Sequence, residues 1–223
     1  MGNWERLVWN QRGVLLQGLA VTVEICLIAF AVALLGGLTL CLIRMYVKPL
    51  RPLAIVLIEF FRATPIFVQL MWVTYVWPEV FGWPDAFFTA GWVALGLQSS
   101  GYLAETLRAG IEAVPRGHRE AGYSVGMSPV MVFVRIVAPQ ALLTVAPSIV
   151  NQFTVIVKSS TLVSVITVQD LMFQALKLVN VWYEPIEILT VVAILYILFV
   201  FSLSQAGKSL ADLLRRRYGL AAA

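Results

Sequence analysis

The chain has 223 residues, of which 60% are hydrophobic and 13% are charged, and its mean hydropathy is +0.86. Soluble domains contain about 45–50% apolar and about 25% charged residues, so this composition excludes an ordinary water-soluble enzyme and indicates a membrane protein. The net charge of +4 does not require a nucleic-acid partner, and we expect none, because an excess of Lys and Arg in cytoplasmic loops gives the same sign.

Five apolar segments of about 20 residues account for roughly half of the chain, which leaves short loops and no room for a separate catalytic domain. The first segment extends from Val14 to Ile43 and is followed by a basic loop whose two prolines break the helix. We therefore expect an all-α polytopic membrane protein with five transmembrane helices in a single domain, residues 1–223. The four later spans are predicted at about Leu53–Trp77, Phe87–Ile111, Pro139–Ile156 and Ile186–Ala206.

The distribution of Lys and Arg predicts how these spans are oriented, because cytoplasmic loops hold the excess of positive charge. With five spans, twelve of the 16 basic residues fall on one side of the membrane and four on the other. This predicts an N-terminus outside and a C-terminus in the cytoplasm, whereas six spans would move one terminus to the other side. The four outer residues are Arg6, Arg12, Lys158 and Lys177, and the twelve inner ones are Arg44, Lys48, Arg51, Arg62, Arg108, Arg116, Arg119, Arg135, Lys208, Arg215, Arg216 and Arg217.

Metal and disulfide chemistry are not expected in this chain. Cys26 and Cys41 stand 15 residues apart on one predicted helix, about 22 Å along its axis, so they cannot pair with each other. The single histidine, His118, has no Cys or His partner at the spacing of metal ligands. We expect a solvated loop histidine and no metal site.

A polar segment, residues 115–129, separates the third and fourth predicted spans and specifies two short helices. Pro115 suits the first turn of one helix, and Gly126 suits the left-handed position at its C-terminal end. Ser128 followed by Pro129 is typical of an N-cap and a first-turn proline of the next helix. The segment therefore predicts a helix-turn-helix corner that presents a compact knob to the cytoplasm, where it could dock into a groove of a partner.

Within this corner, Glu120-Ala121-Gly122 is followed by Gly126 and then by Ile136-Val137-Ala138-Pro139. The pattern resembles the EAA loop of ABC importer permeases, in which Glu-Ala-Ala is followed after three residues by Gly and after nine more by Ile-x-Leu-Pro. Two positions depart from it, because Gly122 replaces the last Ala and Ala138 replaces Leu. By this resemblance the coupling loop covers about residues 115–139, and the fold is the type I ABC importer permease fold with cytoplasmic coupling helices.

Three further motifs resemble the polar-amino-acid branch of the same family, which includes transporters of the histidine, glutamine and glutamate-aspartate type. The resemblance then covers nearly the whole chain, residues 18–217. It implies a permease of the bacterial inner membrane that works with a second permease, identical or homologous, with two ABC ATPase subunits inside and with a substrate-binding protein outside. The three motifs are Glu59–Pro65, Tyr102–Pro115 and Lys158–Val165.

The resemblance also implies how such a transporter is driven. The pattern Gly-x-x-x-x-Gly-Lys-Ser/Thr is absent from the sequence, so we expect no enzyme activity and no cofactor in this chain, with ATP and Mg²⁺ bound by the partner ATPase. By alternating access, ATP binding in the partner would carry the coupling loop with it and open the cavity. The residues expected to couple to the ATPase are Arg119, Glu120, Ala121, Gly122, Gly126, Met127 and Ser128.

Polar side chains inside the spans are candidates for the substrate path, because a charge buried in lipid costs about 3 kcal/mol or more. Neutral polar groups at mid-membrane depth suit a zwitterionic amino acid, and they equally suit hydrogen bonds between helices. Glu59 and Arg62 lie three apart on one helical face and form either part of the path or a local ion pair. Pro65 removes the hydrogen bond to the carbonyl of Phe61 and is expected to bend the second span. The candidate path residues are Glu24, Glu59, Arg62, Thr64, Gln98, Ser99, Asn151, Gln152, Lys158, Ser159 and Ser160.

Other charged residues in the spans receive different predictions. Glu105, Arg108 and Glu112 are spaced three and four apart and are expected to form a structural ladder of ion pairs. The family often has Lys-Asp where this chain has Lys158-Ser159, so the acidic partner of Lys158 is missing. We therefore expect the cavity to favour acidic or neutral amino acids.

Two other classes of function compete with this interpretation. An ion-gradient-driven secondary transporter or channel for small polar solutes would have inverted repeats and more spans, and the sequence shows neither. A membrane assembly factor that transports nothing would need neither polar residues at mid-membrane depth nor a docking corner.

Overall fold

The computed structural model describes residues 3–217, and every regular element within them is helical. Two short 3₁₀ helices and two π-helical turns connect or extend the α-helices. The α-helices are α1 (Asn3–Tyr46), α2 (Arg51–Ala63), α3 (Ile66–Met71), α4 (Trp77–Phe81), α5 (Phe87–Ala113), α6 (Arg116–Ser124), α7 (Pro129–Val132), α8 (Ala138–Ser159), α9 (Leu171–Trp182) and α10 (Pro185–Arg217). The 3₁₀ helices are η1 (Lys48–Leu50) and η4 (Ser160–Ile166), and the π-helical turns are η2 (Trp72–Val76) and η3 (Phe133–Val137).

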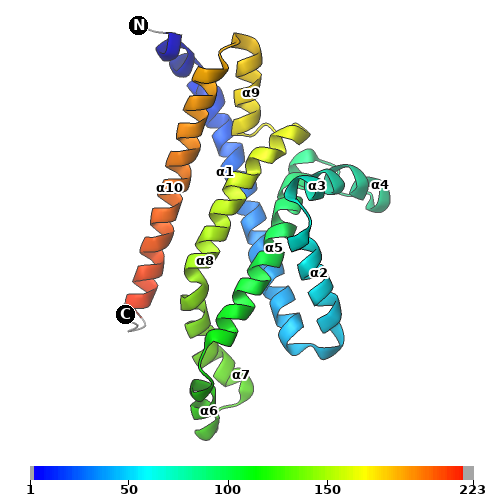
Figure 1. The fold of residues 1–223 in the computed structure, drawn as a ribbon, viewed down its shortest axis with the longest axis vertical. Coiled ribbons are helices and arrows are strands. Elements are labelled where there is room, and N and C mark those ends of the chain that lie inside the picture. The colour runs from blue at the N-terminus through cyan, green and yellow to red at the C-terminus, as the bar shows by residue number, and fades with distance from the viewer. Residues whose placement is uncertain (1–2, 218–223) are drawn as a thin grey trace.

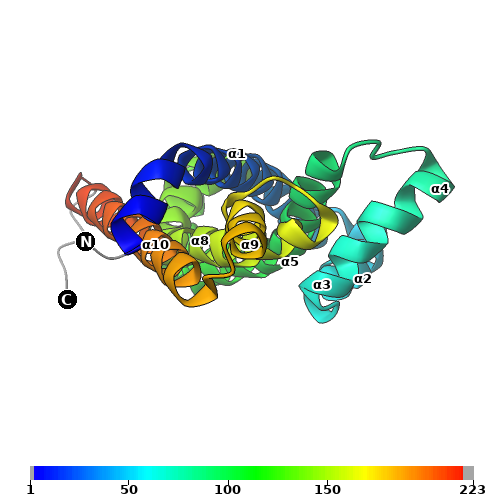
Figure 2. The same cartoon turned by 90° about the horizontal axis from the view of Figure 1, so that it is seen from above.

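Four long helices, α1, α5, α8 and α10, run along the long axis of the molecule, and α5 packs against α1, α2 and α8 (Figure 1). The helices α6 and α7 form a knob at the end of the bundle where α1 turns into α2 and where α10 ends (Figure 1). Helix α9 lies at the opposite end, where α1 begins. Seen from above, α2, α3 and α4 project to one side of the bundle (Figure 2).

Three helical stretches of the described residues are long and apolar enough to cross a membrane: Gln11–Tyr46, Pro129–Ile166 and Pro185–Ser209. They contain the first, fourth and fifth predicted spans. Helix α5 contains the third, and its 27 residues extend for about 40 Å, which is also enough to cross. The all-α architecture is confirmed for the described residues, whereas the number of five complete spans stays a prediction because the second span is broken.

The second predicted span does not form one bent helix. The helical stretches Lys48–Ala63 and Ile66–Phe81 meet at 107°, far more than a proline kink, so α3, η2 and α4 run across the bundle axis (Figure 1). Thr64 has an extended backbone because Pro65 disfavours the helical conformation of the residue before it. The carbonyl of Thr64 accepts a hydrogen bond from Nε2 of Gln98 at 3.1 Å, which satisfies a backbone group that the break leaves free.

The fourth span is longer than the predicted Pro139–Ile156. Helix α8 contains Pro147 in its interior, and the helical run as a whole covers Pro129–Ile166. The π-helical turn Phe133–Val137 comes directly before Pro139, and such a turn lets a helix continue where the regular hydrogen-bond ladder is interrupted. Prolines therefore do not delimit this span as the sequence suggested.

The core consists of three apolar clusters stacked along the bundle. The central cluster joins α1, α3, α5, α8 and η4 and includes Cys26, while the cluster at the knob end includes Cys41. The two cysteines are buried in different clusters, as their separation along α1 requires. The third cluster, at the α9 end, comprises Leu15, Leu171, Ala175, Leu178, Ile188 and Val192.

Candidate functional site

The knob is built as the sequence predicts. Helix α6 begins after Pro115, and Gly126 has a left-handed backbone with φ of +81°, a conformation that glycine adopts without a steric penalty. The N–H of Met127 then donates to the carbonyl of Gly122 at 3.1 Å. Oγ of Ser128 accepts from the N–H of Met131 at 3.3 Å and caps α7. The predicted helix-turn-helix corner is therefore confirmed.

The seven predicted coupling residues face different ways. Gly122 is buried, because a Cβ there would lie 2.8 Å from Ile136 and 2.9 Å from Val132. Arg119 is half-buried, and its Nη2 donates to the carbonyl of Ile111 at the end of α5. Met127 is also half-buried. The members of the set that are exposed on the knob are Glu120, Ala121, Gly126 and Ser128.

Apolar side chains on the exposed side of the knob escaped the sequence analysis. Val125 is 76% exposed and Val130 is 72% exposed, and Tyr123 and Met131 are exposed as well. Large apolar groups in water on a polar segment are typical of a surface that a partner covers. The sequence offers one signal for them. Gly122 and Val132 are buried, and residues next to them along the helices therefore point away from the buried side.

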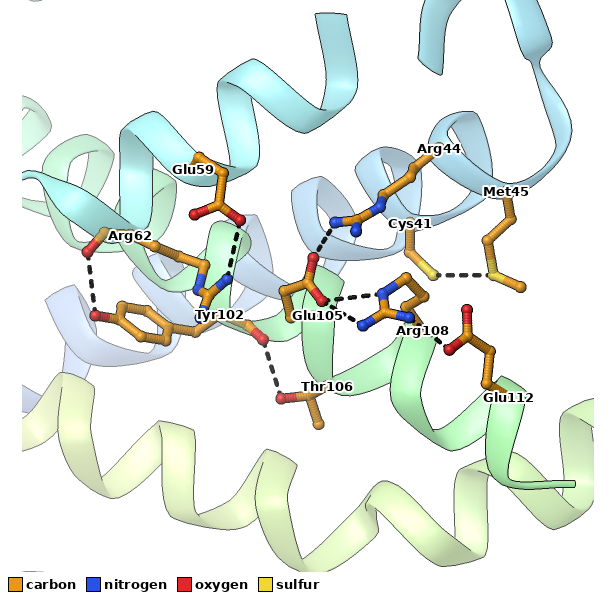
Figure 3. A network of polar contacts seen from close by, with 10 residues as sticks. All are labelled: Cys41, Arg44, Met45, Glu59, Arg62, Tyr102, Glu105, Thr106, Arg108 and Glu112. Atoms are coloured by element: carbon orange, nitrogen blue, oxygen red, sulfur yellow. Dashed lines mark hydrogen bonds and ion pairs between the residues drawn. The ribbon is translucent and has the colours of Figure 1, made fainter. Parts of the chain in front are cut away.

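A ladder of ion pairs lies between the knob and the middle of the bundle (Figure 3). Glu105 contacts Arg108 at 2.9 Å, and Arg108 contacts Glu112 at 2.5 Å, so the predicted ladder along α5 is confirmed. Glu105 also pairs with Arg44 of α1, which the sequence analysis did not foresee. Because all but Glu112 are largely buried, the ladder joins α1 firmly to α5.

Glu59 and Arg62 form the local ion pair that the sequence allowed, at 3.2 Å (Figure 3). The guanidinium of Arg62 lies 5.6 Å from the centre of the Tyr102 ring, and the Tyr102 hydroxyl donates to the Arg62 carbonyl at 3.3 Å. Helix α2 can approach α5 here because a Cβ at Gly101 would lie 3.0–3.1 Å from Ile58, Phe61 and Arg62.

The ion pair of Glu59 and Arg62 lies away from the knob end of α5. Tyr102 lies eleven residues before the end of α5 at Ala113, a distance of about 16 Å along the helix. Arg62 lies within α2 and not in a loop, and its assignment to the cytoplasmic side stays a prediction. Its partner Glu59 is 58% exposed.

The neutral path residues are divided between helix contacts and an exposed face. Nε2 of Gln152 donates to Oγ of Ser99 at 3.2 Å between α8 and α5, and Ser160 is buried with its hydroxyl bonded to Val157. These groups serve helix packing in this structure, and Ser159 is half-buried. The exposed polar face of α8, with spacings of four, three and seven residues, comprises Thr144, Ser148, Asn151 and Lys158.

Glu24 is not brought together with the other path residues. It is exposed on α1, and the spacing places it on the same helical face as the exposed Leu27, Leu35 and Leu38. Among the described residues, no hydrogen bond or ion pair connects the other candidates to Glu24. Glu24 thus stays a prediction that the geometry does not support, and Thr144 and Ser148 are path candidates that sequence analysis missed.

Asp170 forms a second polar site, in the turn between η4 and α9. It is 0% exposed, and its Oδ1 accepts from the N–H of Phe173 at 2.9 Å. Thr22 of α1 accepts from the N–H of Leu171 at 3.0 Å, so the first turn of α9 is fastened to α1. Burial raises the pKa of Asp170 from 3.8 to about 6, against the lowering effect of backbone N–H groups.

A helical membrane body with a docking knob at one end and a polar face along one span defines the permease class of transporter subunits. The chain belongs to the family of binding-protein-dependent transport system inner membrane components, whose sequence model matches residues 25–219. It is accordingly a permease subunit of an ABC transporter and not an enzyme, and its type I ABC importer permease fold is confirmed.

Relatives and solved structures agree with this assignment. The chain is 33% identical over 197 residues to the arginine transport system permease protein ArtQ of Bacillus subtilis (87% of this chain, 90% of ArtQ). It is 31% identical to the probable glutamine ABC transporter permease protein GlnM of Bacillus subtilis, over 95% of this chain and 98% of GlnM. An amino acid ABC transporter crystallised with histidines has a chain that is 35% identical, with a TM-score of 0.84 and coverage of 94% and 96%. The methionine transporter MetNI, 16% identical with a TM-score of 0.80 over 92% of this chain and 98% of that one, shows the fold alone.

Proposed function

We propose that this chain forms the translocation path of an importer of polar amino acids and opens it by alternating access. The exposed polar face of α8, formed by Thr144, Ser148, Asn151 and Lys158, carries the proposal. A charged group held against lipid costs about 3 kcal/mol or more, and charged residues within spans accordingly face water-filled cavities or other protein. This face therefore lines a polar path rather than the hydrocarbon of the membrane.

The charges near the path support acidic or neutral amino acids as substrates. Glu59 and Arg62 lie 3.2 Å apart and offset each other, whereas Lys158 is the one charged side chain of the sequence of α8. A positive group without an acidic neighbour in sequence attracts anionic substrates and repels cationic ones. The relatives carry names for arginine and for glutamine, so the sign of the substrate charge is the point that an experiment must decide.

The partners follow from the knob and from the distribution of charge. We propose that two ABC ATPase subunits, which bind ATP and Mg²⁺, dock on the exposed side of α6 and α7. The turn η1, helix α6 and the turn η3 carry basic residues at the knob end, and this end lies in the cytoplasm by the positive-inside rule. The N-terminus is then outside and the C-terminus inside a bacterial inner membrane. A second permease, identical or homologous, completes the path, and a substrate-binding protein docks at the α9 end.

The test is reconstitution with a candidate ABC ATPase and a candidate substrate-binding protein. The permease is purified with the ATPase in lipid nanodiscs, and ATP hydrolysis is measured with the binding protein loaded with L-glutamate, L-glutamine or L-arginine. We expect the ATPase to co-purify and hydrolysis to rise most with glutamate or glutamine. A strict preference for arginine would refute the substrate proposal, and uptake driven by an ion gradient without any ATPase would refute the class of transporter.

The variant Lys158→Gln isolates the role of the charge. We expect it to lower the preference for glutamate over arginine without abolishing hydrolysis. Lys208→Gln is the matched control, because Lys208 is exposed on α10, away from the polar face of α8 and from the α9 end. An unchanged preference in Lys158→Gln would remove Lys158 from the path.

A further inference from the structure

At the end of α5, the carbonyl of Ile111 has no backbone donor, and the sequence shows why. In a continuous helix, the N–H of residue 115 would donate to the carbonyl of Ile111, but Pro115 has no N–H. Nη2 of Arg119 donates to this carbonyl instead. An arginine in the first half of α6 thus takes the place of the backbone donor that the proline removes.

This hydrogen bond holds two helices that are otherwise joined only by an extended linker. Val114 and Pro115 have extended ψ angles of 123° and 138°, so the helical ladder does not continue from α5 into α6. Within the described part of the chain, the Arg119 bond connects α6 directly to α5. Helix α6 is also attached to α7 and η3 through the buried Gly122, and to α8 through a hydrogen bond of 2.7 Å between Nδ1 of His118 and Oε1 of Gln140.

We propose that Arg119 is a positioning residue, which fixes α6 on the end of α5 so that a displacement of the knob is passed to α5, the helix that carries Tyr102 beside Arg62. The inference rests on the proposed function, and it gives Arg119 an inward role in place of contact with the ATPase. A charged donor to a carbonyl suits this task, because charge-assisted hydrogen bonds are about twice as strong as neutral ones.

The route beyond α5 is also visible. Arg108 and Glu112 flank Ile111 on α5, and Glu105 one turn earlier pairs with Arg44 of α1 (Figure 3). Near the knob, the ring of Tyr46 at the end of α1 packs edge-on against Phe133 of η3, with centroids 5.8 Å apart. A knob fixed to α5 by Arg119 therefore moves α1 and α5 together.

The experiment compares Arg119→Met and Arg119→Lys in the complex of permease and ATPase in nanodiscs. Methionine keeps the length of the side chain and removes the donor, whereas lysine restores a charged donor. Hydrolysis is measured without the binding protein and with the binding protein loaded with L-glutamine, or with L-glutamate or L-arginine where glutamine gives no response. The readout is the ratio of stimulated to basal rates, which a smaller number of intact complexes does not change.

We expect the Arg119→Met permease to keep its bound ATPase and its basal rate of hydrolysis. The ratio of stimulated to basal rates should fall about tenfold, which corresponds to the loss of one charged hydrogen bond. Arg119→Lys should recover most of it, and Arg51→Met, at an exposed arginine of α2 outside the proposed docking surface, should resemble the wild type. An unchanged ratio in Arg119→Met would overturn the inference, as would loss of ATPase binding from a folded permease.

Two further outcomes are informative. If the Arg119→Met permease does not fold, Arg119→Gln replaces it, since glutamine keeps a neutral donor on a shorter side chain. A reduced ratio in the assembled Gln variant then supports the positioning role, and an unchanged ratio refutes it. If the wild-type complex responds to none of the three amino acids, the proposed function itself fails, which is distinct from a responsive wild type with an equally responsive Met variant.

Discussion

The buried Asp170 makes a quantitative prediction about how stability depends on pH. Its side chain is 0% exposed, in a turn outside the long apolar stretch that ends at Ile166. Backbone N–H groups are its stabilising partners, and no basic side chain appears among the causes of its shift within the described residues. Burial therefore dominates and raises the pKa of Asp170 to about 6 from the ordinary 3.8.

The sign follows from linkage. A carboxyl whose pKa is raised by folding favours the folded state while it is protonated, and the folded state loses stability as the pH rises from about 3.8 through about 6. At about 1.36 kcal/mol for each pH unit of difference, the cost at neutral pH is about 3 kcal/mol. The variant Asp170→Asn removes the charge and keeps an oxygen that accepts from the N–H of Phe173.

The measurement is the free energy of unfolding of the detergent-purified permease between pH 4 and pH 7.5. We expect Asp170→Asn to gain about 2–3 kcal/mol relative to the wild type over this range, and to be the more stable protein at pH 7.5. Asp85→Asn is the control, because Asp85 is exposed, and its profile should run parallel to that of the wild type. Parallel profiles for Asp170→Asn and the wild type would refute the reasoning.

Three further substitutions test the knob and the ladder. Gly122→Val places a side chain against Ile136 and Val132 and should cost about 1–3 kcal/mol of stability in thermal unfolding, unlike Gly117→Val, where nothing lies within 4 Å. Gly126→Val forces a branched residue into the left-handed backbone with φ of +81°; it should cost about 1–3 kcal/mol and abolish stimulated ATP hydrolysis, and normal stimulation would contradict this. Glu105→Gln removes a partner of two arginines and should destabilise the protein by about 1–3 kcal/mol. Glu59→Gln at the exposed pair should cost less, under about 1 kcal/mol. If chemical denaturation gave the reverse order, the ladder would not be structural.

The sequence could predict the features that depend on local chemistry. Long apolar runs predicted α1, α5 and α10. Pro115, Gly126 and Ser128 predicted where the helices of the knob begin and end, because each of these residues acts on the backbone within a few residues. The same local rules misjudged Pro139, where a π-helical turn absorbs the interruption. They also underestimated Pro65, because the 107° break depends on where the following apolar helix finds a surface to pack against.

The resemblance to the EAA loop did not predict the direction in which each side chain points. Arg119 lies next to Glu120 in the resemblance, yet it turns inward to α5 while Glu120 is exposed, because neighbours along a helix point about 100° apart. In the same way, Gln152 and Ser99 bond to each other across two helices, a contact that neither segment encodes alone. The polar face of α8 became visible only when burial distinguished Asn151 from Gln152.

Helix α5 connects these observations in one physical argument. Its end is fastened to the knob by Arg119 at Ile111, and nine residues earlier Tyr102 contacts Arg62 of α2, a separation of about 14 Å along the helix. A continuous helix moves over such a length as a rigid body, because its backbone hydrogen bonds remain intact. One turn earlier, Nε2 of Gln98 donates to the carbonyl of Thr64 at the break between α2 and α3, so α5 is also attached to this break. The carbonyl that Pro115 leaves free and the carbonyl beside Pro65 are thus each held by a side chain on or next to α5, Arg119 and Gln98, and a substitution can remove either bond.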